Sequence, residues 1–597
     1  MINNKSKATE LISSESKGYL KEYLRIVRKE QLLDEELWAK FVLQFQNKTD
    51  TDDMGWRGEF WGKVMRGACS VYSYAPCKKL YSVLTNTVKA LLALENNGNI
   101  SSYSKETEFT GWDLWGRKYV LVGLLYYYNI CKNQKLRNRI LKVVDKNVVY
   151  IIKHIGNGEE QKGILEATHI WGGANVSTII VPFMDYFNIC HKKEVLDFVG
   201  YVVNEGFSSC GNIINAVKAG LKPNDYPVTK AYELTSCFEG LFEYAKVTDN
   251  QEYIELCFKY FKSLADNELT VTGCLGCWIE VFSNGAKTQT NAIEVEHQET
   301  CVTVTWLGFL YRLLTFTGES VYADYMEQSV VNNLYGSINT NNQKMKRSKH
   351  KTITENNGNK LLVFDSYSPL YYNYRGSEFG GNKPLDKETT YGCCTSIGSF
   401  GLGIYGNANI LKSANKYLFN LFAEGNYVTK DFTVIQKGNV FKSNQFSLRF
   451  KNVNGEVTIG IRMPRWSTKH VIKVNDNEAH CDIVDGYAII QNIKTDDVIQ
   501  ITYDSTVETL RLNGKIAFRK GAVVLARDES YNDNIKEPIV ESKNYAFKKI
   551  SSNAYKAKLS YRITDKKGKS FIVSDYASVG KNWDNPNSMI SVWLDVK

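Results

Sequence analysis

The chain has 597 residues, too long for a single hydrophobic core, and roughly 150 residues per domain favours two to four domains. Its 43% hydrophobic and 23% charged residues are typical of globular proteins, and the 13% aromatic content suits sugar-stacking surfaces as well as aromatic cores. The net charge of +10 is spread along the chain without the concentrated patch or motif that nucleic-acid binding needs, so no nucleic-acid partner is expected.

The first seventeen residues are polar and lack the apolar segment of a secretory signal. No run of about eighteen apolar residues predicts a membrane-spanning helix. The 13 cysteines are odd in number and lack the regular spacing of a disulfide framework. These features predict reduced thiols, a cytoplasmic location and no membrane partner.

Most apolar residues between positions 18 and 410 recur at intervals of three and four, the period of an amphipathic helix. About a dozen helices in succession, without alternating strands, argue against a Rossmann or TIM arrangement and favour a closed α/α toroid. An open solenoid is the alternative, but no short sequence repeat supports it. Helices are expected near residues 80–95, 135–154, 176–189, 193–206, 230–246, 250–266, 298–316, 320–335 and 396–412.

From about residue 415 the apolar period changes to two, as in Phe446-Leu448-Phe450 and Ile499-Ile501-Tyr503. Turn residues such as Asp485-Gly486 separate these segments, which is a β-sandwich pattern. Alternating residues after about position 515 predict a second, smaller β region. We therefore expect a helical domain over residues 1–412, a β-sandwich domain over 413–520 and a second β region over 521–597.

Several connections between the expected helices are rich in glycine and aromatic residues. Trp56 lies in one such connection, Trp112 and Asp113 lie in a second, and Trp171 lies in a third. Loops at one end of a toroid surround a pocket, so these connections are candidate pocket walls.

The pair Cys393-Cys394 stands at the start of an expected helix. A helix N-terminus lowers the pKa of a thiol, a nearby zinc ion lowers it further, and the resulting thiolate is a good nucleophile. The alternative is that both residues are small buried hydrophobes, because free cysteine is among the most buried residue types.

Glu299-Thr300-Cys301 opens another expected helix. Residues two apart do not share a helical face, so Glu299 and Cys301 could bind one ion only at a helix start or in a loop. With Cys393 and Cys394 they would form a soft, anionic set of the kind that holds Zn²⁺. The alternative is an acid at a helix N-terminus and a core cysteine.

Cys274 and Cys277 form a C-x-x-C motif, a rival metal or redox site, although no second such motif and no thioredoxin-like pattern accompanies it. Glu280 follows directly, with Glu294 and Glu296 beyond it. Any of the three could be a general acid, and each taken alone could equally be a surface carboxylate.

Taken together, these motifs resemble the zinc-dependent cysteine glycosidases of the β-L-arabinofuranosidase type, glycoside hydrolase family 127 and its relatives. The resemblance runs over nearly the whole chain, and the order and spacing of the motifs are specific. They are Trp56-Arg57-Gly58-Glu59-Phe60-Trp61-Gly62, Gly123-Leu124-Leu125-Tyr126-Tyr127-Tyr128, Ser236-Cys237-Phe238-Glu239-Gly240-Leu241, Thr272-Gly273, Glu299-Thr300-Cys301, Gly392-Cys393-Cys394, Arg462-Met463-Pro464-Arg465-Trp466, Val474-Asn475-Asp476 and Gly486-Tyr487.

The resemblance implies an (α/α)6 barrel followed by β-sandwich domains. It implies a zinc ion held by Glu299, Cys301, Cys393 and Cys394, with Cys393 as the nucleophile that forms a thioglycosyl-enzyme and gives net retention. It points to Glu280 as the acid/base. Many members carry a histidine two residues before the cysteine pair, where this chain has Tyr391.

We therefore predict an exo-acting, retaining glycoside hydrolase for small glycosides or oligosaccharides, with a β-L-arabinofuranoside as the leading substrate. A lyase or sugar epimerase on an α/α toroid is one alternative. Such enzymes usually use His and Tyr as base and acid, and this chain has only 7 histidines. A non-catalytic carbohydrate-binding protein with structural zinc is another. A homodimer formed through the β region is an open alternative to a monomer. The predicted sugar contacts are Trp56, Trp112, Asp113, Trp171, Tyr367 and Tyr391.

Overall fold

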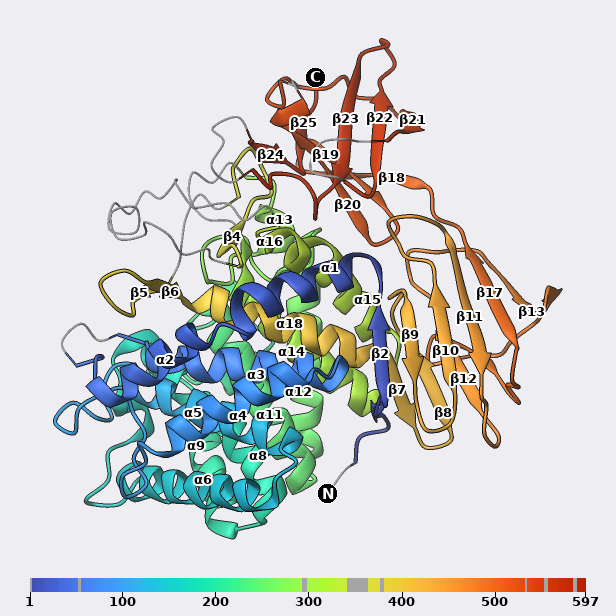
Figure 1. Ribbon diagram of the computed structural model, residues 1–597. Helices are drawn as coiled ribbons and strands as arrows, with labels where there is room; N and C mark the ends of the chain where they lie inside the picture. The colour runs from blue at the N-terminus through green and yellow to red at the C-terminus, as the bar shows by residue number, and fades with distance from the viewer. Residues whose placement is uncertain are drawn as a thin grey trace.

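A helical barrel forms the first two thirds of the chain, and β-sheets form the remainder (Figure 1). The predicted fold class, an (α/α)6 barrel followed by β-sandwich regions, is confirmed. The structure, a computed structural model, describes residues 3–51, 55–291, 298–340, 363–375, 381–531, 534–551, 557–582 and 588–597.

Six inner helices form the wall of the barrel within the described part of the chain. Each contacts the next, and the last contacts the first, so that the ring is closed. Helices α3 and α5 approach closely because α3 carries Gly62, where a Cβ atom would lie 1.8 Å from the Tyr119 carbonyl oxygen. The inner helices are α3 (Gly58–Tyr74), α5 (Asp113–Ile130), α8 (Ile180–Cys190), α11 (Ala231–Thr248), α14 (Thr300–Thr317) and α18 (Cys393–Ala408).

An outer layer of amphipathic helices covers this ring. Helix α6, for example, buries Leu136, Ile140 and Val144 at the spacing of one helical face, while its other face is charged. The inner helices are instead buried on nearly all sides, as expected for helices enclosed by others. The outer helices are α1 (Gly18–Val27), α2 (Glu35–Asn47), α4 (Lys78–Leu92), α6 (Gln134–His154), α9 (Lys193–Asn204), α12 (Gln251–Asn267) and α15 (Val321–Gln328).

Two β-sheets pack as a sandwich beside the barrel. Phe419 of one sheet and Phe450 of the other have ring centroids 6.1 Å apart. The first sheet has the order β1 (Lys7–Ala8), β7 (Ile410–Ser413), β8 (Lys416–Phe419), β12 (Thr458–Arg462), β16 (Tyr487–Ile490), β15 (Ile483–Val484). The second has the order β14 (Asn477–Glu478), β13 (His470–Val474), β17 (Val498–Tyr503), β11 (Gln445–Lys451), β10 (Thr433–Lys437), β9 (Gly425–Val428), β2 (Ser13–Ser16).

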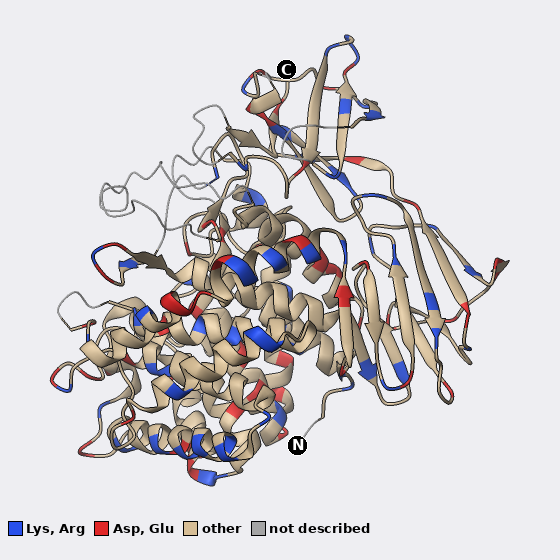
Figure 2. Ribbon diagram, in the orientation of Figure 1, with Lys and Arg blue, Asp and Glu red and all other residues tan. Residues whose placement is uncertain are grey.

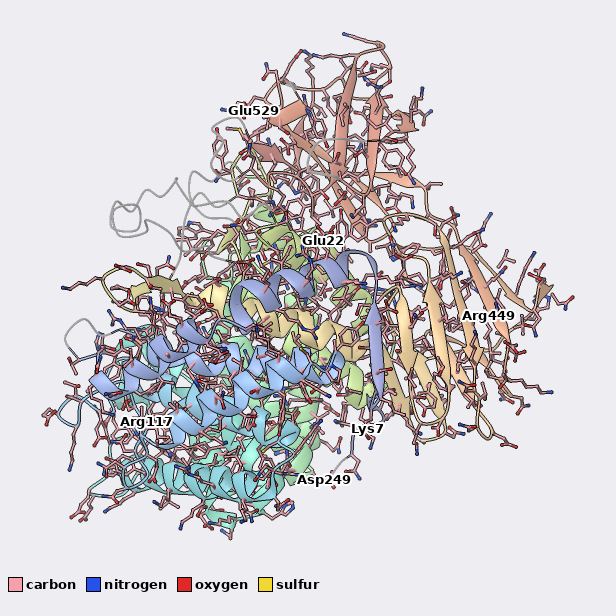
Figure 3. The ribbon with its side chains drawn as sticks, viewed as in Figure 1. Lys7, Glu22, Arg117, Asp249, Arg449 and Glu529 are labelled. Atoms are coloured by element: carbon pink, nitrogen blue, oxygen red, sulfur yellow. The ribbon has the colours of Figure 1, made fainter. Side chains whose placement is uncertain are left out.

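The N-terminal segment contributes one strand to each sheet of the sandwich. Strand β1 pairs with β7, and β2 pairs with β9, so the first residues of the chain tie the barrel to the β region. Figure 3 shows Lys7 at this junction, with Arg117 in the barrel and Arg449 in the sandwich.

A third sheet forms the C-terminal end of the chain, where Figure 3 places Glu529. Its order is β18 (Val507–Leu512), β19 (Lys515–Lys520), β20 (Val523–Asp528), β23 (Ser570–Asp575), β22 (Ser560–Thr564), β21 (Ala546–Lys549), with β24 (Ile590–Ser591) paired to β20 and β25 (Leu594–Asp595) paired to β19. The three domain ranges expected from the sequence stay a prediction.

Charged residues of both signs are interspersed along the barrel and the sheets (Figure 2). Within the described residues, no helix is both long enough and apolar enough to cross a membrane. All 13 cysteines lie in the described residues, and none forms a disulfide.

Candidate active site

The N-terminal ends of inner helices meet at one end of the barrel around a cavity of about 230 Å³, which we call the cysteine cavity. Glu59 and Lys63 reach it from the start of α3, Glu233 from the start of α11 and Cys393 from the first position of α18. Because helix N-termini carry partial positive charge, this end of the barrel favours anionic groups. The cavity is lined by Trp56, Glu59, Lys63, Trp112, Trp115, Trp171, Lys230, Tyr232, Glu233, Glu280, Glu299, Cys301, Gly381 and Cys393.

One carboxylate and three thiols gather at this cavity, with one ligand atom from each residue all within 4.8 Å of one another: Glu299, Cys301, Cys393 and Cys394. Glu299 is the N-cap residue of α14 with extended backbone, whereas Cys301 lies in the first turn. This placement at a helix start lets two residues that are two positions apart point at one centre.

Short strands fix the two segments that carry these residues. Glu299 ends β3 (Gln298–Glu299), which pairs with β4 (Tyr367–Ser368). The cysteine pair follows β6 (Thr390–Gly392), which pairs with β5 (Asn382–Pro384). The Sγ atoms of Cys393 and Cys394 are 3.8 Å apart, and Cys394 Sγ lies 3.5 Å from Glu299 Oε1.

The three thiols differ in their electrostatic environment. Hydrogen bonds with Cys301 and Cys394 hold the pKa of the Cys393 thiol well below its usual value, and the positive charges of Lys63 and Lys230 act in the same direction. Burial instead raises the pKa values of Cys301 and Cys394 well above the usual value. Cys393 is also only partly buried, so it is the thiol best placed to act as a nucleophile.

The cluster fits a metal cation. Burial raises the pKa of the Glu299 carboxyl to about 8, and its buried Oε2 atom has no hydrogen-bond partner among the described residues. A buried carboxylate and three thiolates repel one another unless a cation compensates their charge. Three sulfur atoms and one carboxylate form a donor set suited to soft or borderline metals.

Gly381 makes room for the Cys393 thiol. Its φ is +59°, and a Cβ atom at this position would lie 2.4 Å from Cys393 Sγ. The Gly381 carbonyl oxygen accepts hydrogen bonds from Cys393 N (3.0 Å) and from Trp56 Nε1 (3.1 Å). This glycine therefore joins the nucleophile candidate to an aromatic wall of the cavity.

Glu280, the predicted acid/base, lines the same cavity as Cys393. Its carboxylate forms an ion pair with Lys230 and accepts a hydrogen bond from the Tyr367 hydroxyl (3.3 Å). Lys230 also lies 3.9 Å from Glu233, and its Nζ is 5.0 Å from the centre of the Trp171 ring. Lys230 thus shares its charge between two carboxylates beneath an aromatic face.

A buried carboxylate fixes the loop that follows Glu280. Glu268 accepts hydrogen bonds from the backbone N–H groups of Ser283 (2.9 Å), Asn284 (3.0 Å) and Gly285 (3.0 Å). Burial raises the pKa of Glu268 to about 7. Sequence reasoning did not assign Glu268 a role, because only the folded loop shows what it binds.

Further charged residues of the cavity were not singled out from the sequence. Glu59 forms an ion pair with Lys63 (2.9 Å) and accepts a hydrogen bond from Trp115 Nε1, and burial raises its pKa to about 7. Burial also raises the pKa of Glu233. The i, i+4 spacing of Glu59 and Lys63 was visible in the sequence, but the same spacing is common on solvent-exposed helix faces.

Three of the predicted sugar contacts, Trp56, Trp112 and Trp171, line the cavity. The rings of Trp56 and Trp112 meet edge to face with centroids 5.9 Å apart. Tyr367 contacts Glu280.

The other two predicted sugar contacts face elsewhere. Asp113 accepts hydrogen bonds from Arg117 Nε (2.9 Å) and Phe109 N (2.7 Å) inside the barrel wall. The ring of Tyr391 packs against Phe41.

The rival C-x-x-C motif does not form one centre. Cys274 Sγ lies 3.5 Å from the Glu299 carbonyl oxygen, whereas Cys277 Sγ lies 3.1 Å from Thr288 Oγ1. The alternative acids Glu294 and Glu296 lie outside the described residues.

Comparison with protein families gave two matches along the chain. A family described as β-L-arabinofuranosidase, GH127 catalytic domain, matches residues 15–347, which is more than half of the chain. A family described as β-L-arabinofuranosidase, GH127 middle domain, matches residues 417–505. No curated protein sequence gave a significant match.

Solved structures resemble the chain over its whole length. A GH127 β-arabinofuranosidase has a TM-score of 0.76 at 16% identity, covering 100% of this chain and 99% of its own. A GH127 β-L-arabinofuranosidase from Geobacillus stearothermophilus T6 has a TM-score of 0.68 at 14% identity, covering 98% and 100%. A structure described as a glycoside hydrolase has a TM-score of 0.71 at 13% identity, covering 99% and 98%. At these identities the likeness shows a shared fold.

Proposed function

The chain belongs to the GH127 β-L-arabinofuranosidase family, and on that basis we propose that it is a retaining glycosidase with Cys393 as nucleophile and Glu280 as general acid and base. One observation carries this assignment of roles. A thiol whose pKa is lowered and a carboxylate with a hydroxyl partner line one cavity of sugar size. Retaining glycosidases need such a pair, one group to attack the anomeric carbon and one to move protons.

In the first step, the Cys393 thiolate attacks the anomeric carbon as the bond from that carbon to the leaving oxygen breaks. The Glu280 carboxyl gives its proton to the leaving oxygen, so the aglycone departs as a neutral alcohol. The sugar is then bound to Cys393 Sγ with inverted configuration.

In the second step, the Glu280 carboxylate takes a proton from water as the water oxygen attacks the anomeric carbon. The carbon–sulfur bond breaks, the Cys393 thiolate is restored, and the second inversion gives net retention. Glu280 must therefore alternate between two protonation states. Lys230 contacts Glu280 and lies 3.9 Å from Glu233, so its positive charge acts on both carboxylates.

The residues that would hold a zinc ion are Glu299, Cys301, Cys393 and Cys394. When bound, zinc supplies a positive charge that keeps buried thiols ionised at neutral pH and moderates their nucleophilicity. The first turns of α14 and α18 add partial positive charge at the same place.

The walls of the cavity support a small sugar as substrate. Trp56, Trp112 and Trp171 offer aromatic faces on which a sugar ring can stack. Buried carboxylates such as Glu59 and Glu233 can accept hydrogen bonds from sugar hydroxyls. We propose a terminal β-L-arabinofuranosyl group as the substrate, in keeping with the names of the GH127 relatives.

Product analysis with a panel of aryl glycosides tests the proposal. We expect hydrolysis of the aryl β-L-arabinofuranoside, with proton NMR showing the β-anomer first. Cys393→Ala should lose activity by about a thousandfold or more, and Glu280→Gln should lose most activity on substrates with poor leaving groups. The matched control is Cys210→Ala, which changes an exposed thiol.

Three outcomes would contradict the proposal. One is an unsaturated or isomerised sugar as product, and another is the inverted anomer as first product. The third is full activity of Cys393→Ala. Absence of stoichiometric zinc in protein purified under reducing conditions would count against the metal assignment alone.

A further inference from the structure

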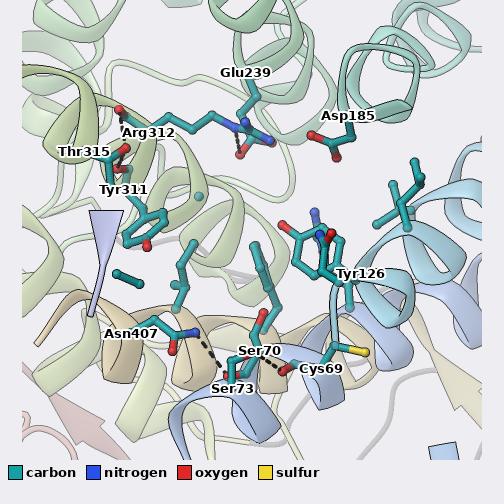
Figure 4. A pocket seen from close by; sticks show the side chains of 18 of the residues that line it. Cys69, Ser70, Ser73, Tyr126, Asp185, Glu239, Tyr311, Arg312, Thr315 and Asn407 are labelled. Carbon is teal, nitrogen blue, oxygen red and sulfur yellow. Dashed lines mark hydrogen bonds and ion pairs between the residues drawn. The ribbon is translucent and has the colours of Figure 1, made fainter. Parts of the chain in front are cut away.

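A second cavity, which we call the basal cavity, lies deeper in the barrel and has a volume of about 530 Å³ (Figure 4). The same inner helices line it farther along their length: on α3 Arg66 follows Glu59 by seven residues, and on α14 Gly308 follows Cys301 by seven. At a rise of 1.5 Å per residue the basal cavity therefore begins about 10 Å below the cysteine cavity. Its volume lies within the usual range of small-molecule sites, about 300–1,000 Å³.

Arg66 brings an unpartnered cation to this cavity. It is only 5% exposed, its Nε has no hydrogen-bond partner, and within the described residues it has no ion pair. Its guanidinium lies over the ring of Phe400, with Cζ 4.0 Å from the ring centre. A buried guanidinium without polar partners costs free energy, so its retention indicates a ligand or water that it binds.

Asp185 brings the complementary acceptor from α8. Within the described residues it has neither an ion pair nor a hydrogen bond to another side chain, and burial raises its pKa to about 6. Figure 4 shows its carboxylate directed into the space between Tyr126 and Glu239. The cavity thus presents one unpartnered donor group and one unpartnered acceptor group.

A fixed polar frame forms one wall of the basal cavity. Arg312 contacts Glu243 (2.7 Å) and Glu239 (3.6 Å). Gly308 leaves the space that Glu239 occupies, because a Cβ atom there would lie 2.4 Å from Glu239 Oε1. These ion pairs fix the side chains of this wall, whereas Arg66 and Asp185 can still form hydrogen bonds with a ligand in the cavity.

The charges that line the basal cavity balance. Among the described lining residues, three are basic and three are acidic: Lys7, Arg66, Arg312, Asp185, Glu239 and Glu243. An anion would meet three carboxylates, and a cation would meet Lys7 and two arginines. A neutral ligand with several hydroxyl groups avoids repulsion from either set of charges. A hydroxyl group can accept a hydrogen bond from Arg66 and donate one to Asp185.

We propose that the basal cavity is a second binding site, for a neutral mono- or disaccharide, held between Arg66 and Asp185. The rings of Tyr126 and Phe400, 5.9 Å apart and edge to face, supply the apolar surface that sugar rings need. Exposed side chains at the rim, Asn129 and Asn188, leave an entrance from solvent. The N-terminal segment borders the cavity where Ser6 N donates to the Thr315 carbonyl oxygen (2.9 Å).

Calorimetric titration of the full-length Cys393→Ala variant tests the proposal without turnover. The probes are L-arabinose and maltose, with D-glucuronate and D-glucosamine as charged analogues. We expect a neutral sugar to bind with a Kd of about 1 mM or tighter, at a site that survives the further change Trp112→Ala in the cysteine cavity. Adding Asp185→Asn, which keeps the side-chain shape, should weaken this site at least about tenfold, as should Arg66→Gln.

The matched control is Asp197→Asn, which alters an exposed aspartate on α9 and should leave the titration unchanged. The proposal is overturned if neither neutral probe binds outside the cysteine cavity, or if Asp185→Asn leaves the binding unaltered. Tighter binding of D-glucuronate or D-glucosamine at this site would also overturn it. No readout is catalytic, so failure of the basal site would leave the proposed glycosidase activity standing.

Discussion

Lys230 and Glu280 form an ion pair on the wall of the cysteine cavity, facing the nucleophile candidate. The pair joins the residue before α11 to the loop that follows α12. It is supported from both sides, because Tyr367 donates a hydrogen bond to Glu280 and Trp171 lies beside the Lys230 ammonium. The position of Glu280, the proposed acid/base, therefore depends on a lysine to which the proposal gives no chemical step.

Replacing Lys230 by Met should lower kcat/KM by about tenfold to a hundredfold, because the Glu280 carboxyl loses its positioning partner. The loss should be larger for substrates whose leaving group needs protonation than for activated aryl glycosides. Steady-state kinetics with two leaving groups measures this difference. The control is Lys193→Met, which removes an exposed i, i+4 ion pair on α9. Equal losses on both substrates would contradict a role through Glu280.

Replacing Gly381 by Ala should abolish most activity while the fold is kept. The new methyl group would lie 2.4 Å from Cys393 Sγ, so the thiol or the loop must move. A displacement of about 1 Å at a reacting group can cost about a hundredfold in rate. Gly514→Ala is the matched control, because Gly514 also has positive φ (+72°) but has nothing within 4 Å of the new Cβ. Full activity of Gly381→Ala would contradict the prediction, and an equal loss in Gly514→Ala would show that contact with Cys393 is not the cause.

Arg462 joins the β-sandwich to the barrel and should be important for stability. It is completely buried on β12, contacts Asp324 and lies 2.8 Å from Glu327 of α15. Replacing it by Met leaves the buried Glu327 carboxylate without its cation and Asp324 with only the exposed Arg465 at 3.4 Å, and breaking such a buried ion pair typically costs about 3–5 kcal/mol. Thermal unfolding should show a clear loss, whereas Arg449→Met, at an exposed pair, should cost less than about 1 kcal/mol. Equal midpoints for the two variants would contradict this account.

The sequence predicted most helices of the barrel, because a helix packed on one side shows its apolar stripe directly. It did not predict α2 or the inner helix α3, whose start was instead interpreted as a connection rich in glycine and aromatic residues. The last inner helix begins at Cys393 and ends at Ala408, whereas 396–412 was expected. Residues after Ala408 are apolar because they enter β7, and apolar character alone does not separate the end of a buried helix from a buried strand.

Pairings between distant segments could not be predicted. Strand β1 finds its partner β7 about 400 residues later, and nothing in a two-residue strand indicates that register. The cysteine cluster could be predicted because one carboxylate and three thiols, all near two expected helix starts, form a donor set typical of a zinc site. Lys230 was not, because a lysine before a helix is usually solvated, and only the fold places it against Glu280.

Lys118 offers a prediction on pH dependence. It is buried between the two cavities, where its Nζ donates to Ser236 Oγ (2.9 Å), and burial lowers its pKa to about 7 from an ordinary value of 10.5. Between pH 7 and 10.5 the unfolded chain therefore binds a proton that the folded chain lacks, so stability rises with pH in this window. The free-energy cost of burying Lys118 is greatest below about pH 7, where its ammonium is charged in both states, and it vanishes above pH 10.5.

Lys118→Met should remove this penalty and raise the free energy of unfolding at pH 7, by an amount on the order of a few kcal/mol. The difference in free energy of unfolding between Lys118→Met and the unchanged chain should shrink as the pH is raised toward 10. Thermal midpoints measured at several pH values between 7 and 10 test this, with the exposed Lys262→Met as control. Parallel pH profiles for Lys118→Met and the unchanged chain would show that Lys118 remains protonated in the fold, since a lysine charged in both states contributes no slope.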